Sequence, residues 1–376
     1  MAEWQSSALG TLVEVKGGKR LPKGVSLLDK PNSHPYIRIR DLGKSKTLEL
    51  TTEYGYVDDT TQTGLARYIV NEGDVLLSIV GTIGLTAIVG ASLNKANLTE
   101  NCVRFVNLNG IDAEFLYYYL TSSLGQNEIR KGTVGAVQPK LPIKNIQSFI
   151  IRYPSLDYQK QIVSLLKAID DKIEYNVAIN NNLQQQAFTI FDEQFPSYND
   201  GVMIIGDYIS PKRGKNLLFK DAVLGEVPVV AGGLEAATYH NVANTVAPVL
   251  TISASGANAG FVNLWHTPVW ASDSSFIDSA MTKDVFFWFV LLKKRQREIF
   301  DSQTGSAQPH IYPQHIAAMR IPTFDKEKIA AYVEQVQPLF TLIGANIREN
   351  ACLAILRDTL LPKLMSGEID VSDIEI

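Results

Sequence analysis

The chain has 376 residues, 45% of them apolar, and its 35 Lys and Arg against 39 Asp and Glu give a net charge of −4. This composition predicts a folded protein of two or three domains and excludes a disordered chain. The two cysteines are far apart, which excludes a disulfide framework and a Cys-x-x-Cys metal site. No apolar run reaches the roughly 18 residues of a membrane span, which excludes a transmembrane protein. We therefore expect a cytoplasmic protein.

Residues 1–153 are predicted to form an α+β domain with a net charge of +3. Short β-branched runs that end in glycine turns predict strands, and residues 115–130 have the pattern of a helix. Basic side chains lie in glycine- and proline-rich loops and, for Arg38 and Arg40, on one face of a predicted strand at period-two spacing. Cations on flexible loops suit phosphate contact. The candidates in this segment are Lys16, Lys19, Arg20, Lys23, Arg38, Arg40 and Lys44.

Residues 154–195 are predicted to form one long helix. Apolar residues recur at helical spacing, as at Ile162, Leu166 and Ile169, and the segment contains no glycine. About 38 helical residues would span roughly 57 Å. Amides such as Asn176 interrupt the apolar stripe, and buried amides fix the register of a helix pair at a cost in stability.

Residues 196–321 are predicted to repeat the first domain, and they carry no net charge. Three blocks recur in the same order, so we interpret the two segments as a duplication. The matching blocks are 9–19 with 205–215, 115–120 with 286–291, and 135–142 with 306–313. This alignment also places Thr133 opposite Thr304.

The duplication strengthens the case for a nucleic-acid surface. One basic loop alone would be interpreted as a solvated surface, but Lys-x-Gly-Lys and Lys-Arg-Gly-Lys stand at the same place in both copies. The phosphate-contact candidates in the second copy are Lys212, Arg213, Lys215 and Lys220. Base reading needs side chains that donate or accept hydrogen bonds, and the candidates are Ser253, Ser255, Asn258, Gln138 and Gln308. For Gln138 and Gln308 we place a structural role, with the side chain bonded to the backbone of a Gln-Pro turn, ahead of base contact.

Residues 322–376 are predicted to form a second long helix and carry a net charge of −4. Pro338 and Gly344 interrupt its apolar pattern, so we expect a kink or break at 338–344. Because each long helix follows one copy of the domain, we expect the two helices to pair as an antiparallel coiled coil. The alternative is that they pack separately.

No catalytic motif is present. The sequence has no phosphate-binding loop, no Gly-x-Ser-x-Gly turn and no His-Glu-x-x-His pair. His310 and His315 lie near one another without a Cys or acidic partner, so we expect them to be surface residues, not metal ligands. We therefore predict a binding protein without a catalytic site, metal or cofactor.

The order of the parts and several motifs are similar to a known family. The chain resembles, over nearly its whole length, the specificity subunit of type I restriction–modification enzymes. The residues that carry the resemblance are the helix entry at 154–162, the helix segment at 169–176, the closing segment at 356–369, the glycine turn and its continuation at 132–142, and the turn-to-strand at 73–77.

The resemblance implies two target-recognition domains, at 1–153 and 196–321, each contacting one half of a bipartite site in double-stranded DNA. It implies that the helices at 154–195 and 322–376 serve as a spacer and dock two modification subunits. Those partners would bind S-adenosylmethionine and methylate adenine, and restriction subunits would supply ATP- and Mg-dependent translocation. The alternatives are a DNA-binding adaptor of another defence system and, with less support, a divergent DNA methyltransferase or nuclease.

Overall fold

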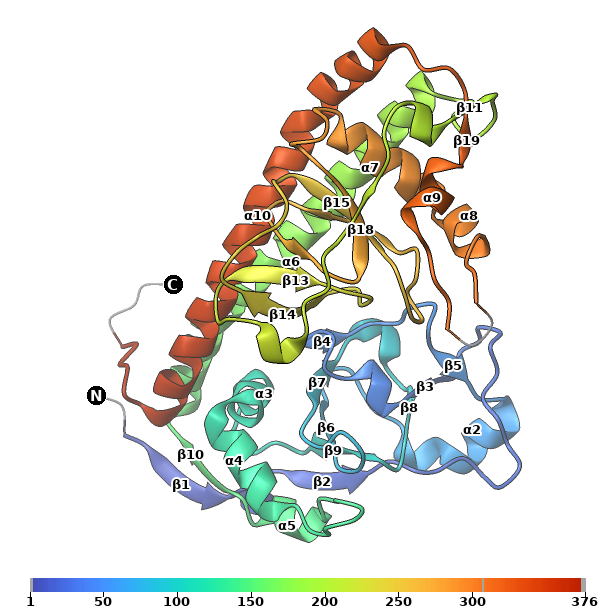
Figure 1. Ribbon diagram of the computed structural model, residues 1–376. Coiled ribbons are helices and arrows are strands. Elements are labelled where there is room, and N and C mark those ends of the chain that lie inside the picture. The colour runs from blue at the N-terminus through green and yellow to red at the C-terminus, as the bar shows by residue number, and fades with distance from the viewer. Residues whose placement is uncertain (1–2, 306–307, 373–376) are drawn as a thin grey trace. The chain divides into compact units, whose positions relative to one another are not determined.

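The structure is a computed structural model that describes residues 3–305 and 308–372 (Figure 1). The chain divides into two compact units. The first unit is Met1–Ile173 with Cys352–Ile376, and the second unit is Glu174–Ala351. Each unit combines a globular α+β part with a portion of each of two long helices, so the expected α+β fold is confirmed.

The first unit contains a five-stranded sheet that is antiparallel except for one edge strand. In spatial order its strands are β2 (Glu14–Gly17), β9 (Cys102–Val106), β6 (Val75–Ser78), β7 (Thr86–Val89) and β4 (Thr47–Leu48). A second sheet has the order β5 (Gly55–Tyr56), β3 (Pro35–Ile37) and β8 (Asn97–Leu98), and β1 (Gln5–Ala8) pairs with β10 (Ile150–Tyr153). The helices are α1 (Leu9–Leu12), α2 (Asp59–Leu65), α3 (Ala113–Thr121), α4 (Ser123–Gly132) and α5 (Ile143–Gln147), with 3-10 turns η1 (Ile39–Asp41), η2 (Ala66–Tyr68) and η3 (Ala91–Leu93).

The second unit contains a four-stranded antiparallel sheet. Its strand order is β12 (Lys212–Arg213), β18 (Ser274–Asp278), β15 (Val249–Ser253) and β16 (Val262–Trp265). A second sheet has the order β14 (Ala236–His240), β13 (Val227–Val230) and β17 (Trp270–Ala271), and β11 (Met203–Ile204) pairs with β19 (Arg320–Ile321). The helices are α7 (Val285–Lys294), α8 (Gln296–Asp301) and α9 (Pro313–Ala317), with 3-10 turns η4 (Ile205–Asp207) and η5 (Phe219–Asp221).

The two units share one topology. The order β2-β9-β6-β7 matches β12-β18-β15-β16, and the parallel pair β3–β8 matches β13–β17. The predicted duplication is therefore confirmed at the level of strand order. One detail of the alignment is wrong, because Val134 bridges Lys140 where Thr304 bridges His310. Thr304 is thus equivalent to Val134, not to Thr133, and a loop of constant length closes in both units.

The core of the second unit is aromatic. The Phe287 ring lies 5.2 Å from the rings of Phe195 and Phe324, and Phe191 and Tyr332 complete the cluster. Because these rings come from α6, α7, α10 and the segment before α10, the cluster joins the globular part of this unit to its helix pair. The apolar run at the start of α7 is buried on every face, which explains why it lacks an amphipathic pattern.

The two long helices are α6 (Leu156–Gln194), with 39 residues, and α10 (Lys326–Ser366), with 41 residues. The length of α6 agrees with the roughly 38 residues expected from the sequence. In the second unit, Asn176 bonds Asn350 and Asn346 bonds Asn180, each at 2.8 Å. Along these contacts the residue numbers of α10 fall as those of α6 rise, so the two helices run antiparallel. The buried amides of Asn176 and Asn346 set the register of the pair. In the first unit, Arg357 bonds Asp170 at 3.0 Å in the same sense.

Of the kink or break expected in α10, the break is wrong, because the helix is continuous through 338–344, and the kink stays a prediction. Pro338 and Glu334 are both exposed, so water can satisfy the carbonyl that Pro338 leaves without a hydrogen bond. Gly344 has a different role: a Cβ atom there would lie 2.8 Å from the His266 ring. Glycine thus lets the helix approach the sheet closely, and burial lowers the pKa of His266 to about 4.

Substituting Gly344 with alanine is expected to destabilise the protein by about 1–3 kcal/mol, because the ring of His266 must move. Gly64 in α2 is the matched control, since a Cβ atom there meets nothing within 4 Å. Gly64→Ala should stabilise by about 0.5–1 kcal/mol through helix propensity. Urea denaturation of the full chain measures both, and equal stability of Gly344→Ala and the wild type would contradict the close approach.

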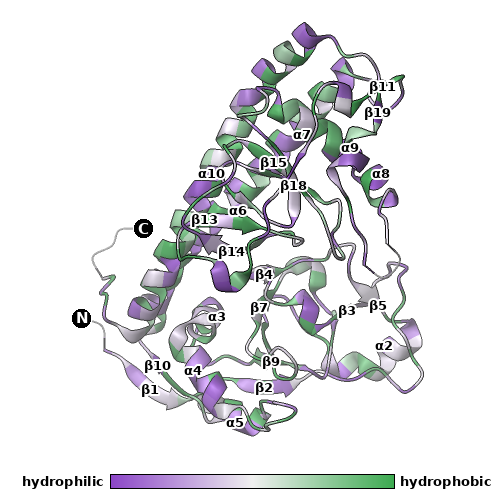
Figure 2. Ribbon diagram, in the orientation of Figure 1, coloured by the Kyte–Doolittle hydropathy of each residue, from purple (hydrophilic) through white to green (hydrophobic). Residues whose placement is uncertain are grey.

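By length and composition alone, α10 is apolar enough to cross a membrane, although it contains no uninterrupted apolar run of that length. Such a helix is weak evidence for a membrane protein. Only 22% of its most apolar stretch is buried, so the helix keeps an uncovered apolar face. Figure 2 shows hydrophobic residues along much of α10, interspersed with polar ones.

Candidate nucleic-acid interface

Three predicted loops of the first unit meet at one edge of its larger sheet, which we call the loop edge. Strand β2 ends there, and the amide of Gly18 bonds the carbonyl of Cys102 at 3.0 Å, where β9 begins. The glycine turn after β6 is held by the bond from the Ile79 amide to the Asn101 carbonyl, at 2.8 Å. The Gln-Pro loop joins them because Val80 bridges Lys140. Loops 18–24, 79–85 and 134–140 therefore lie together.

The second unit has the same loop edge. The Gly214 amide bonds the Ser274 carbonyl at 2.8 Å, and the Ala254 amide bonds the Asp273 carbonyl at 3.1 Å. Ser255 bridges His310, which brings the Gln-Pro loop of this unit to the same place. Candidate residues that are distant in the sequence are thus neighbours in each unit.

The repeated glycine of the basic loop has a structural cause. A Cβ atom at Gly18 would lie 2.0 Å from the carbonyl oxygen of Thr99, and one at Gly214 would lie 2.5 Å from that of Ala271. Only glycine fits such a close approach of two backbones. The glycines therefore hold the loop against the sheet, and the lysines beside them project outward.

Some cations of the loop edge are paired and others are not. In the first unit, Lys16 pairs with Glu14 at 3.1 Å and Arg20 with Glu100 at 2.6 Å. Lys19 lies 5.6 Å from the ring centre of Tyr68. Within the described ranges, neither Lys19 nor Lys23 has an ion pair, and both are exposed.

Arg38 and Arg40 do not form the predicted basic face of a strand, and Lys44 follows them in the same segment. Strand β3 ends at Ile37, and the Asp41 carboxylate accepts the Arg38 amide at 2.7 Å, which caps the turn η1 in place of further strand. All three side chains bond Glu53: its carbonyl accepts from Arg38 at 2.9 Å and Arg40 at 3.2 Å, and its carboxylate pairs with Lys44 at 2.8 Å.

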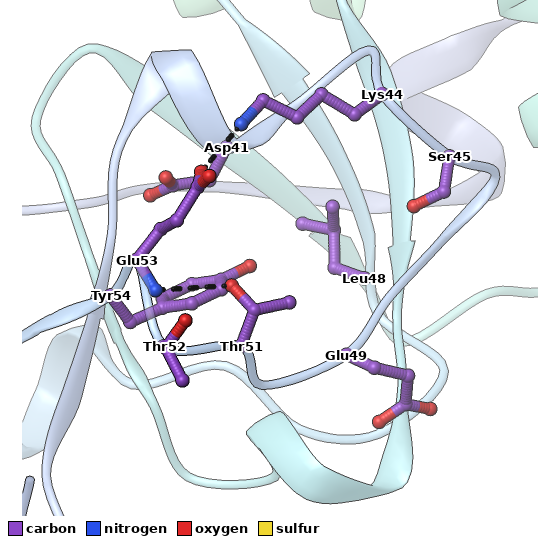
Figure 3. A pocket seen from close by; sticks show the side chains of 9 residues that line it. All are labelled: Asp41, Lys44, Ser45, Leu48, Glu49, Thr51, Thr52, Glu53 and Tyr54. Atoms are coloured by element: carbon purple, nitrogen blue, oxygen red, sulfur yellow. Dashed lines mark hydrogen bonds and ion pairs between the residues drawn. The ribbon is translucent and has the colours of Figure 1, made fainter. Parts of the chain in front are cut away.

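Glu53 lines a pocket of about 260 Å³ in the first unit. In Figure 3, Lys44 and Glu53 point toward one another at the side of this pocket, which Asp41, Leu48, Glu49 and Tyr54 also line. The hydrogen bond and the charge of Lys44 hold the pKa of Glu53 below its usual value. Arg38, Arg40 and Lys44 are therefore bonded within residues 38–53.

In the second unit, Arg213 pairs with Asp273 at 2.6 Å, and Asp273 also accepts a hydrogen bond from the Ser255 hydroxyl. Lys212, Lys215 and Lys220 are exposed and have no ion pair among the residues that the structure describes. Asn258 is half-buried in the glycine turn.

Ser253 and the two candidate glutamines, Gln138 and Gln308, differ in solvent exposure. The Ser253 side chain lies in β15 and is 3% exposed, which removes it from the surface. Gln138 and Gln308 are exposed, and neither side chain makes a hydrogen bond in the described part of the chain. The backbone carbonyl of Gln308 instead accepts a hydrogen bond from Nδ1 of His310 at 2.8 Å, so the loop is held without the glutamine side chain.

Sequence reasoning missed the acidic residues of the interface. Glu53, Glu100 and Asp273 each hold an arginine or lysine that the charge pattern presented as free. No motif marks them, because their partners are 9 to 80 positions away. Glu53 reaches its partners within one segment, whereas strand pairing brings Glu100 and Asp273 to theirs. Between residues 3–305 and 308–372, no group of three or more His, Cys, Asp or Glu side chains is arranged to hold a metal ion.

The comparisons with known proteins agree with one another. The family described as Type I restriction modification DNA specificity domain matches residues 1–185. The MjaIX specificity subunit of a type I restriction enzyme from Methanocaldococcus jannaschii is 24% identical, over 90% of this chain and 88% of that protein. A putative type I specificity subunit of Mycoplasma pneumoniae is 22% identical over 96% of each chain. In fold, the chain is similar to the type I restriction–modification S subunit from M. genitalium, with a TM-score of 0.58 over 96% of each chain and 18% identity.

Proposed function

Because the chain belongs to the specificity subunits of type I restriction–modification enzymes, we propose that each of its units reads one half of a bipartite site in double-stranded DNA through its loop edge. Proteins of this family recognise DNA and have no catalytic site of their own. The observation that carries the proposal is the loop edge itself, which occurs twice with the same three loops.

The side chains of the loop edges fall into two groups. Exposed lysines without ion pairs suit phosphate contact, which positions a protein on DNA without reading sequence. They are Lys19 and Lys23 in the first unit and Lys212 and Lys215 in the second, and Lys220 in η5 is likewise exposed. Base reading is assigned to the exposed amides of Gln138 and Gln308 and to the half-buried side chains of Asn258 and Ser255, since an amide can pair with adenine through two hydrogen bonds.

The helix pair is proposed to dock the modification subunits. Large apolar side chains are exposed on both helices, including Tyr175 and Leu342 in the second unit and Ile355 in the first. Exposed apolar groups in one region mark surfaces that a partner covers. We propose that two modification subunits bind here and carry S-adenosylmethionine, that restriction subunits with ATP and Mg join them, and that the assembly works in the cytoplasm.

Mapping of methylated adenines tests this function directly. The full chain is expressed with its modification subunits in a host without other adenine methylation of that kind. We expect a new motif of two specified parts separated by unspecified bases, absent when the chain is omitted. Methylation that is unchanged without this chain would contradict the specificity role, and a motif with one continuous part would contradict reading by two units.

A further inference from the structure

We propose that Arg213 reads a guanine in the half-site contacted by the second unit, and that Asp273 is the residue that positions it. The proposal rests on the DNA-recognition function above and deepens it. It differs from the initial interpretation of Arg213 as a phosphate contact, because the structure shows an arginine that is held in place beside a carboxylate.

The contacts of Arg213 within the described ranges hold its guanidinium in place and leave most of its N–H donors free. One Nη2–Oδ1 bond of 2.6 Å ties Arg213 to Asp273, and the Ser255 hydroxyl bonds the other oxygen of the same carboxylate. Ser255 is itself held by its bridge to His310 in the Gln-Pro loop. The Arg213 side chain remains 40% exposed, and this bond is its one hydrogen bond in the described part of the chain.

An arginine held in this way suits a base better than a phosphate. A guanidinium has five N–H donors in a planar fork, so after one bond to Asp273 two donors can still meet N7 and O6 of guanine. Holding the side chain in advance reduces the conformational entropy lost on binding. A phosphate at this position would be repelled by the neighbouring carboxylate, which is 31% exposed.

The lysines on either side have the opposite character. Lys212 and Lys215 are exposed and have no ion pair among the described residues, which leaves them free to follow the DNA backbone. Strand β12 and the turn after it thus contain two exposed lysines without ion pairs among the described residues and one arginine held by a carboxylate. That difference within four residues separates phosphate contact from base contact.

The first unit has the same arrangement at a shifted position. Arg20 pairs with Glu100 at 2.6 Å, again between the basic loop and the turn before the neighbouring strand. Arg20 follows the structural glycine Gly18 by two residues, whereas Arg213 precedes its equivalent, Gly214, by one. A fixed arginine at different places in the two loops would place guanine at different positions in the two half-sites.

Two readouts on the full chain, assembled with its modification subunits, test the assignment to Arg213. In the methylated motif, Arg213→Ala should broaden one guanine position of one half-site and leave the other half unchanged. In binding assays, replacing that guanine with 7-deazaguanine, which lacks the N7 acceptor, should weaken wild-type binding by about fivefold to a hundredfold. Inosine at the same position is the control, because it keeps N7 and O6 and loses only a minor-groove amine.

Asp273→Asn tests the positioning role. It should broaden the same guanine position while general DNA binding at low salt is kept, and Arg213→Lys should do likewise because lysine lacks the planar fork. Arg297→Ala with Asp301→Asn is the matched control, since this pair is also exposed, at 3.1 Å, in the same unit. Circular dichroism confirms that each variant is folded.

The contrary outcomes are distinct. In the first, Arg213→Ala weakens binding equally on every DNA sequence and still loses affinity when the guanine is replaced with 7-deazaguanine. That result would show that Arg213 contacts phosphate, and it would overturn the proposal but not the DNA-recognition function. A second half-site without guanine would overturn it as well. If Asp273→Asn only strengthened binding and left the motif intact, the positioning role would be wrong. Failure of the wild type to bind or methylate any specific motif would instead contradict the proposed function.

Discussion

Replacing Lys212 and Lys215 with alanine is expected to weaken DNA binding by about tenfold to a hundredfold at 0.1 M salt, on every DNA sequence alike. Both lysines are exposed, have no ion pair in the described segments, and flank the glycine that fixes their loop to the sheet. Each phosphate contact contributes about 0.9 to the slope of log K against log salt. The double variant should therefore flatten that slope by about 1.8, as measured by titrations between 0.05 and about 0.2 M salt.

Lys326 provides the control for this experiment. It is an exposed lysine of the same unit, in the first turn of α10, and has no ion pair within the described ranges. Lys326→Ala changes net charge in the same direction and should leave the salt dependence unchanged. An identical slope in the wild type and the Lys212, Lys215 double variant would contradict phosphate contact at this loop.

Phe287→Ala is expected to destabilise the protein by about 3–5 kcal/mol. The ring is fully buried and makes edge contacts with Phe195 at 5.2 Å, Trp288 at 5.1 Å and Phe324 at 5.2 Å. Removing it leaves a cavity where α7 meets the two long helices, and the surrounding rings cannot all move to fill it. Urea denaturation followed by tryptophan fluorescence measures the loss.

Phe219→Ala is the control for the same unit, because the Phe219 side chain is 80% exposed. It should change stability by less than about 0.5 kcal/mol. A loss below about 1 kcal/mol for Phe287→Ala would mean that the aromatic cluster is not the main link between the globular part of the second unit and its helices.

Much of the fold could be predicted from the sequence, because its signals are local. The spacing of Ile162, Leu166 and Ile169 and the absence of glycine were enough to predict α6. The repeated blocks were enough to predict two copies of one topology. The break in α10 was predicted wrongly because the cause of Gly344 lies outside the helix, in the ring of His266, which no helix pattern contains.

The candidate site was harder to predict for a physical reason. The sequence identified cations and amides, but which of them are free depends on acids brought close by strand order. The period-two spacing of Arg38 and Arg40 indicated a strand. In the structure Asp41 caps a turn there, and the Glu53 carbonyl accepts hydrogen bonds from both arginine side chains. Similarly, nothing local connects Arg213 with Asp273, since they become neighbours through the pairing of β12 with β18.

The discontinuity of the first unit has a consequence for synthesis on the ribosome. Every residue of the second unit lies within Glu174–Ala351, whereas the first unit needs Cys352–Ile376 as well as Met1–Ile173. Within the first unit, the Tyr158 hydroxyl bonds both Asp370 and the amide of the buried Val371. A nascent chain that has not reached residue 352 therefore contains every residue of the second unit. At that stage the first unit, although its larger segment was made first, still lacks residues 352–376. The order in which the two halves can be completed is the reverse of the order in which they are translated.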